Sequence, residues 1–304
     1  MVIVAAIVVP RFHQAGVYTA YEYLEKRFDG RTRTLTAVVF LIQRGLGVGV
    51  ALYAPAVVLS VIFGWSDRWM VLLMGSLVIT YTVAGGIQAV TWTDVQQMAI
   101  MFLGILAAVV SAVALLPAEV SFGDALSLAG VAGRLNAVDL SFDWKNRYNL
   151  WSGLIGGMFL ALSYFGCDQS QVQRYLTGKS VRHMRMSLIF NAVMKVPMQF
   201  LILLTGALVF VFFVFEAPPM LFDRAERDRV SATQGYGETE ARYRQAFEER
   251  QQAARGFLAA RDGAAAERFR ATRERFETAR GEGIKLVGKP YNDTNHIFLT
   301  FVTR

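Results

Sequence analysis

The feature that most constrains this chain is a series of apolar segments, each nearly as long as a bilayer is thick. A helix needs roughly 17–25 apolar residues to cross the hydrocarbon core. Five segments approach or exceed that length: Thr36–Phe63, Trp69–Ala84, Val95–Leu116, Leu150–Gly166 and Ser187–Phe215. The 304 residues are 54% hydrophobic, which is too apolar for a soluble domain of this size. The sequence therefore predicts an all-α membrane protein, a polytopic helical bundle with five full crossings.

Two shorter apolar stretches lie at the ends of the chain. We interpret Met1–Val9 as the tail of a helix whose beginning is missing. The alternative, a signal peptide, lacks a basic region, and Pro10-Arg11 stands where small residues precede a cleavage site. Asn295–Val302 begins a further helix. We thus expect a transmembrane bundle with an N-terminal partial span over 1–216, an extracytoplasmic charged helical insertion over 217–289, and the start of a truncated helix over 290–304.

Basic residues gather in two loops that four crossings separate. The loop after Pro10 holds Arg11, Lys26, Arg27, Arg31 and Arg33, and the loop after Gly166 holds Arg174, Lys179, Arg182 and Arg185. The positive-inside rule makes their common side cytoplasmic. It also explains the net charge of +7 without nucleic acid, which we do not expect as a partner. We predict a multi-pass protein of the plasma membrane, the inner membrane of a bacterium.

A hydrophilic segment, Gly85–Gln97, separates the second predicted span from the third and contains Asp94. A charged side chain deep in a bilayer costs at least ~3 kcal/mol, so it usually marks an ion or substrate path. One interpretation of Asp94 is a cation or proton site at the cytoplasmic mouth. The other is that Thr93 or Asp94 caps the following helix, whose dipole favours a negative charge there. The two can hold together.

The predicted span Leu150–Gly166 is short and interrupted by Gly153, Gly156 and Gly157. Such spans are typical of the discontinuous helices of secondary transporters. Irregular backbone at membrane depth survives only where it is buried in protein or lines a watery cavity. Tyr164 and Phe165, at the end of this span, are therefore candidate gate residues. Their alternative is an aromatic belt at the inner interface, which the sequence alone favours.

Two basic side chains lie inside predicted spans. Lys195 precedes Pro197, which predicts a helix kink, and it either contacts a solute or extends to the interface. Arg44 precedes three alternating glycines and is better explained as a structural pairing residue. No nucleophile–base pair, phosphate loop or metal-ligand cluster is present, so we expect neither an enzyme nor a histidine-bound metal. The lone cysteine excludes an internal disulfide.

The charged insertion has an 11-residue repeat. Its members are Tyr243, Ala254, Ala265 and Phe276, with Phe247, Leu258 and Phe269 as a second set. Such a repeat forms a nearly straight stripe on a helix. Asp-Gly favours a break at Arg261-Asp262-Gly263, so we predict a helical hairpin over Glu238–Ala260 and Ala264–Arg280, with one long helix as the alternative. The insertion either binds a protein partner, caps the external vestibule, or is solvated without a role in transport, which we favour.

Three stretches together resemble the sodium/solute symporter family: Thr19–Phe28, Gly85–Gln96 and Asp168–Arg174. The resemblance implies a leucine-transporter-type inverted repeat of five plus five core helices. Met1–Val9 then resembles the end of the second core helix and the five spans resemble the third to seventh. Asn295–Arg304 resembles the approach to the eighth, so the chain looks like a fragment.

The resemblance also implies roles for particular residues. Sodium is the implied coupling ion, but its main site uses the first and eighth core helices, so no sodium ligand is assignable here. Asp94 matches an aspartate on the fifth core helix, near the cytoplasmic sodium path. Tyr164 aligns with the inner-gate tyrosine of the sugar branch, and Phe165 stands where that branch has tryptophan. Lys195 aligns with a lysine that contacts substrate.

These observations favour part of a sodium-coupled symporter that works by alternating access between the two sides of a lipid bilayer. Its substrate is a small-molecule solute of unknown identity. The alternative is a membrane-anchored sensor or scaffold whose outward hairpin binds a protein partner. Polar and glycine-broken membrane segments favour transport, because a scaffold needs none.

Overall fold

A computed structural model describes residues 1–136, 138–143, 146 and 149–303 of the chain. Every regular element within them is a helix, which confirms the all-α prediction. The chain divides into two compact units. The first unit comprises Met1–Ile100 and Val138–Met198, and the second comprises Met101–Ala137 and Gln199–Arg304. Each unit is described by itself.

The first unit begins with a π-helical turn that continues into α1. Its helices are η1 (Val4–Val8), α1 (Val9–Ala15), α2 (Ala20–Arg27), α3 (Gly30–Phe63), α6 (Leu150–Gly166) and α7 (Gln169–Leu176), with the N-terminal parts of α4 (Asp67–Ala114) and α8 (Val181–Phe215). Buried Val9, Tyr21, Phe165 and Val172 belong to one core cluster that joins α1, α2, α6 and α7.

Polar residues at the helix starts explain where these helices begin. Thr19 accepts a hydrogen bond from the Glu22 backbone N–H at 2.9 Å, and the Glu22 carboxylate accepts one from the Tyr18 N–H at 2.9 Å. Asn149 likewise caps α6, accepting from the Ser152 N–H at 2.8 Å. Such caps satisfy backbone donors that a helix leaves free at its N-terminus.

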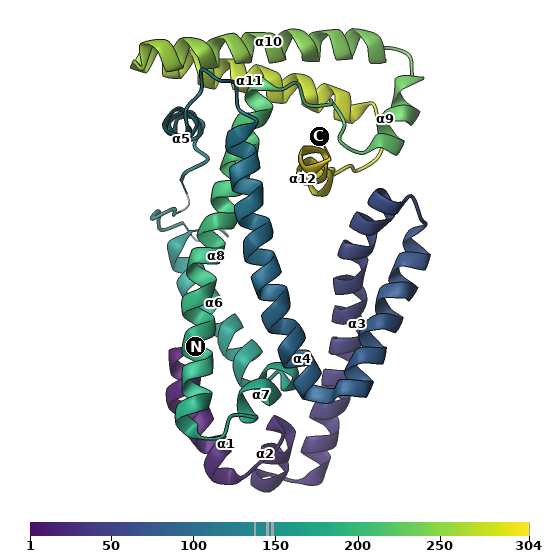
Figure 1. Cartoon of the computed structure of the whole chain (residues 1–304), viewed down its shortest axis with the longest axis vertical. Coiled ribbons are helices and arrows are strands. Elements are labelled where there is room, and N and C mark those ends of the chain that lie inside the picture. The colour runs from purple at the N-terminus through teal and green to yellow at the C-terminus, as the bar shows by residue number, and fades with distance from the viewer. Residues whose placement is uncertain (137, 144–145, 147–148, 304) are drawn as a thin grey trace. The chain divides into compact units, whose positions relative to one another are not determined.

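Helix α4 contains two of the predicted spans, Trp69–Ala84 and Val95–Leu116, except that it ends at Ala114. Its 48 residues are interrupted at Gly86, whose φ of 55° and ψ of −152° are not helical. Figure 1 shows the ribbon of α4 turning sharply there. The expected turn at Gly85-Gly86 is therefore confirmed, and the helical segment that follows starts at the kink and not at Val95.

In the part of the chain that the structure describes, three helices are long and apolar enough to cross a membrane. They are α3 over Gly30–Ser60, α4 and α8. A fourth candidate is α6 together with α7, which meet at a bend of 65°. The bend lies at Cys167-Asp168, whereas Gly153, Gly156 and Gly157, where the sequence predicts the interruption, lie within the continuous helix α6.

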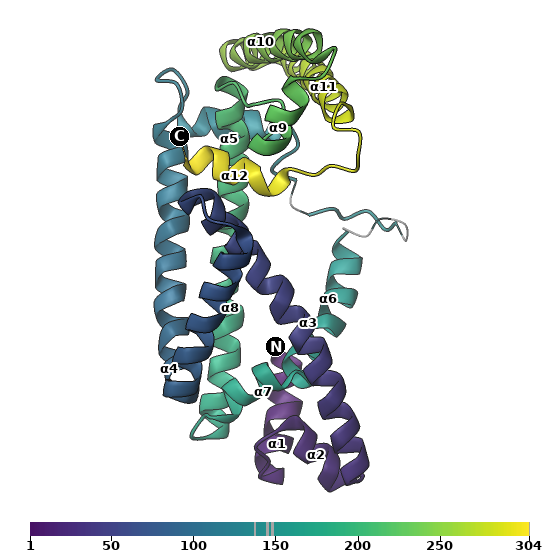
Figure 2. The same ribbon diagram turned by 90° about the vertical axis from the view of Figure 1, so that its right-hand side faces the viewer.

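The second unit contains the C-terminal parts of α4 and α8 and the charged insertion. Its other helices are α5 (Phe122–Val131), α9 (Arg224–Ser231), α10 (Tyr236–Ala260), α11 (Gly263–Lys285) and α12 (Thr294–Val302). Figures 1 and 2 show α10 and α11 side by side, which confirms the predicted hairpin. Arg261, with φ of 53°, ends α10, and Asp262 caps α11 by accepting from the Ala265 N–H at 2.7 Å.

The hairpin is fastened to the rest of its unit by arginine and glutamine side chains. Arg250 Nη2 donates to the Phe213 carbonyl at 2.5 Å, and Gln251 Nε2 donates to the Phe215 carbonyl at 2.6 Å. Further arginines reach α5 and the residue after it: Arg261 pairs with Asp124, Arg270 donates to Val131 O, and Arg273 donates to Ala132 O. The insertion thus packs against α5 and the end of α8.

Candidate functional site

The short helix α7 connects several polar residues of the first unit. Asp168 precedes it and caps it, accepting from the Ser170 N–H at 2.9 Å. The other carboxylate oxygen of Asp168 lies 3.6 Å from Arg44 Nη1 on α3. Asp168 is therefore the partner of Arg44, which the sequence predicts to be a pairing residue without indicating its counterpart.

Gln169 joins α7 to the start of α2. Its Oε1 accepts from the Ala20 backbone N–H at 2.9 Å, and its Nε2 donates to the Tyr18 carbonyl at 3.4 Å. One side-chain amide thus satisfies a backbone donor and a backbone acceptor at the start of α2, where the Thr19–Phe28 stretch begins. These two hydrogen bonds connect the start of α7 to the start of α2.

Asp94 pairs with the far end of α7. Its Oδ2 lies 2.8 Å from Arg174 Nη1, with 40% and 48% of the two side chains exposed. The expectation that Thr93 or Asp94 caps a helix is wrong, because both residues lie inside α4 after the Gly86 kink. Thr93 Oγ1 instead donates to the carbonyls of Ala89 and Val90 at 3.0 and 2.9 Å.

The candidate gate residues Tyr164 and Phe165 lie next to Lys195, the candidate solute contact. Phe165 is buried, and the Tyr164 ring meets it edge-on at 4.9 Å between centroids. Lys195 Nζ lies 5.4 Å from the Phe165 ring centroid, a distance suited to a cation–π contact. The Tyr164 hydroxyl accepts from Gln171 Nε2 of α7 at 2.8 Å. The structure thus brings Tyr164, Phe165 and Lys195 together.

A pocket of about 230 Å³ lies beside Tyr164 in the first unit. Residues of α2, α3 and α6 line it, together with Asp168. Its polar lining residues are Tyr21, Thr36, Gln43, Ser163, Tyr164 and Asp168. The volume is below the 300–1,000 Å³ that is typical of ligand pockets.

The sequence does not indicate the contacts that Asp168, Gln169, Gln171 and Arg174 make in this arrangement. The sequence does mark this region as polar, because a run of polar residues follows closely on the apolar Leu150–Gly166 segment. Which side chain each one meets depends on tertiary structure. Among the described residues, no His, Cys, Asp and Glu side chains gather into a group that could hold a metal ion.

Comparison with known proteins matches residues 1–228 to the Sodium:solute symporter family. The chain is similar to the Homo sapiens sodium/iodide cotransporter, with 33% identity over 226 residues. It is 37% identical over 181 residues to the Oryctolagus cuniculus sodium-dependent multivitamin transporter and 37% over 194 residues to Homo sapiens sodium-coupled monocarboxylate transporter 1. These alignments cover 73%, 59% and 64% of this chain. They span 34%, 28% and 31% of the relatives, about a third of their length.

Proposed function

The chain belongs to the sodium:solute symporter family, and from this premise we propose that it forms part of a symporter that couples solute entry to sodium by alternating access. The family implies an integral membrane protein, a small-molecule solute and sodium as the coupling ion. In the proposed cycle, sodium binding favours an outward-open state, the solute follows, and the bundle rocks to release both inside.

The observation that carries the proposal is the Asp94–Arg174 contact at 2.8 Å. It joins two of the three stretches that resemble the family, and Gln169 joins the third. Half-exposed ion pairs contribute only ~0–1 kcal/mol, so a sodium ion can compete with Arg174 for the same carboxylate. We assign Asp94 to the cation path toward the cytoplasm. Arg174 would replace sodium at the Asp94 carboxylate and so ease release of the ion.

The contact chain of Tyr164, Phe165 and Lys195 supports a gate beside the solute path. The edge-on rings would close the path, and the Lys195 ammonium group would contact the solute. A cationic group there favours an anion. Iodide and monocarboxylates, named for two of the relatives, are anions, so the first solutes to test are of this kind.

We place the protein in a plasma membrane, the inner membrane in a bacterium, with the basic loops after Pro10 and Gly166 in the cytoplasm. The charge distribution supports this orientation. The insertion over 217–289 would then face outward, where its exposed charged surface is available to a protein partner.

Uptake by the full-length gene product in vesicles tests the proposal. Radiolabelled iodide and a set of monocarboxylates are offered with an inward sodium gradient or an equal potassium gradient. We expect sodium-dependent uptake of at least one solute, reduced about tenfold by Asp94→Asn, equivalent to ~1.4 kcal/mol. Asp67→Asn, the same change on the exposed start of α4, is the matched control and keeps wild-type uptake.

Two results would contradict the proposal. One is the absence of uptake for every solute in a preparation whose insertion and orientation are verified. The other is uptake that does not depend on sodium. Either would favour the alternative of a membrane-anchored sensor or scaffold. Sodium-dependent uptake that Asp94→Asn leaves unchanged would remove Asp94 from the cation path.

A further inference from the structure

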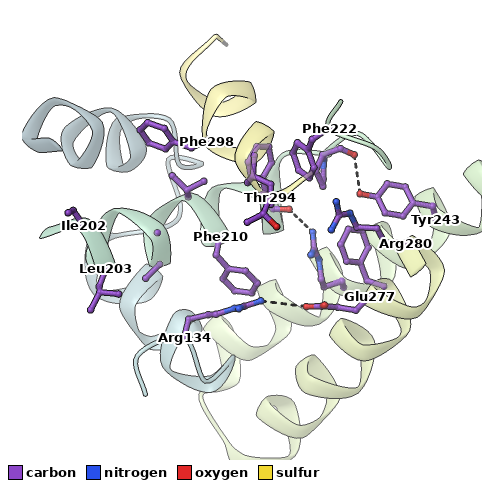
Figure 3. A pocket seen from close by; sticks show the side chains of 18 residues that line it. Arg134, Ile202, Leu203, Phe210, Phe222, Tyr243, Glu277, Arg280, Thr294 and Phe298 are labelled. Atoms are coloured by element: carbon purple, nitrogen blue, oxygen red, sulfur yellow. Dashed lines mark hydrogen bonds and ion pairs between the residues drawn. The ribbon is translucent and has the colours of Figure 1, made fainter. Parts of the chain in front are cut away.

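A second cavity, of about 540 Å³, lies entirely within the second unit. The C-terminal part of α8, the α10–α11 hairpin and α12 form its walls (Figure 3). Five phenylalanines line it: Phe210, Phe213, Phe222, Phe276 and Phe298. Its volume falls within the 300–1,000 Å³ of small-molecule sites, and such sites typically combine apolar walls with a few polar groups.

The charged residues that line this cavity are mostly basic. Arg134, Arg250 and Arg280 face a single acid, Glu277. Two of the three arginines already have carboxylate partners. Arg280 Nη2 lies 2.7 and 2.8 Å from the oxygens of Asp293. Arg134 pairs with Glu277 at 3.6 Å, a contact that Figure 3 draws as a dashed line.

Arg250 differs from the other two. It is only 3% exposed, and its Nε finds no hydrogen-bond acceptor among the residues that the structure describes. Its guanidinium group is held by the Phe213 carbonyl at 2.5 Å and stacks 3.7 Å from the Phe276 ring centroid. Neither contact brings a negative charge.

Glu277 attracts Arg250 through space, but its ion pairs are with Arg134 and Arg273. A buried charge without a directly paired counterion is costly, because it has lost its water and gained no opposite charge in contact with it. Burial lowers the pKa of Arg250 to about 10, so the group is still a cation at neutral pH. An anion in the cavity would supply both the missing charge and an acceptor for Nε. The surrounding rings would bury an apolar body attached to that anion.

We propose that this cavity binds an amphipathic anion, with its charged head at Arg250 and its apolar chain or ring against the phenylalanines. The ligand is either a free organic carboxylate or the anionic head and upper chain of a lipid. The α10–α11 hairpin and α12 lie wholly beyond residue 228, where the family match ends. The site therefore combines these segments with the C-terminal part of α8, and it is separate from the residues of the proposed transport path.

Equilibrium dialysis of labelled decanoate tests the proposal, with the 304-residue chain in nanodiscs of zwitterionic lipid. We expect saturable binding of one decanoate per chain. Arg250→Met keeps much of the side-chain volume but removes the charge, and should weaken binding at least about tenfold. Arg250→Lys keeps the charge but replaces the planar guanidinium group with an ammonium group, and it should retain part of the affinity.

A pair of glycine variants provides a test that does not depend on Arg250. Gly206 lines the cavity, and a Cβ atom built there meets nothing within 4 Å outside the helix's own nearby backbone. Gly206→Leu should therefore fill the cavity and abolish binding without distorting the backbone. Gly256 lies on the exposed face of α10 with equally open space, so Gly256→Leu is the matched control and should bind as the wild type does.

Nanodiscs that contain phosphatidylglycerol distinguish the two sources of the anion. If the lipid occupies the site, phosphatidylglycerol should displace decanoate; if it does not, decanoate binding should persist. The proposal is overturned if decanoate shows no saturable binding. It is also overturned if Gly206→Leu, verified as folded by circular dichroism, binds decanoate as well as Gly256→Leu does. If Arg250→Met does not fold, the glycine pair decides.

Discussion

Arg174 holds Asp94 through a contact of 2.8 Å that joins α7 to α4 within the first unit. The residue before α7, Asp168, reaches Arg44 on α3, and Gln169 reaches the start of α2. One eight-residue helix with its cap therefore connects three other segments. Because the ion pairs are partly exposed, each contributes little to stability. Their structural and functional roles can therefore be separated by mutation.

Exchanging the two charges separates the roles of Asp94 and Arg174. Either single change, Asp94→Arg or Arg174→Asp, places like charges together and should cost about 1 kcal/mol or less. The double variant restores an ion pair and should recover most of that stability in a thermal melt. Sodium-dependent uptake should remain low in the double variant, because the carboxylate has left α4. Full recovery of uptake would mean that Asp94 serves only as a structural partner.

Asp168 has two separable functions, a helix cap and an ion pair. Asn caps helices about as well as Asp, so Asp168→Asn should remove mainly the attraction to Arg44, worth ~0–1 kcal/mol for a partly exposed pair. Asp168→Ala also removes the cap and should cost about 1 kcal/mol more. Thermal unfolding of both variants measures the difference. Equal losses would show that the cap contributes nothing and that the Arg44 pair accounts for the whole effect.

The predicted spans and the hairpin could be located from the sequence because their signals are local. Long apolar runs mark α3, α4 and α8, and Leu150–Gly166 coincides with α6. The break at Arg261-Asp262-Gly263 is correct because Asp262 caps a helix and the αL residue before it ends one. The 11-residue repeat continues through that break, and in the hairpin Tyr243 and Phe276 meet with ring centroids 4.8 Å apart.

The site could be predicted only as separate residues. Asp94 and Lys195 are candidates because charged groups within or between membrane spans are unusual. Tyr164 and Phe165 are candidates because they end a glycine-interrupted span. Their partners lie far away in the sequence: Arg174 for Asp94, and Asp168 for Arg44. No local pattern indicates such pairs, because packing decides them. The capping interpretation of Asp94 failed because the helix begins at Gly86, a boundary set by backbone conformation and not by hydrophobicity.

Gly86 should be irreplaceable at the kink of α4. Its φ of 55° with ψ of −152° lies close to a region that only glycine adopts readily, so Gly86→Ala should cost of order 1–3 kcal/mol. Gly104→Ala is the control in the same helix. Its added methyl meets nothing within 4 Å, and alanine favours a helix over glycine by about 1 kcal/mol. Thermal unfolding in nanodiscs should thus show a lower midpoint for Gly86→Ala and a higher midpoint for Gly104→Ala. An unaltered midpoint for Gly86→Ala would refute the strained kink.

The hairpin should hold α5 in place through Arg273. This side chain donates to the Ala132 carbonyl just after α5, where a helix leaves acceptors without intrahelical partners. Arg273→Ala should cost about 1 kcal/mol and raise amide hydrogen exchange in residues 122–136. Arg275→Ala is the matched control, because Arg275 is largely exposed and pairs with Glu249 at 3.7 Å inside the hairpin. It should leave exchange in 122–136 unaltered. Equal protection of that segment in both variants would show that the Arg273 hydrogen bond does not hold α5, which leaves its buried apolar residues and the contacts of Arg261 and Arg270.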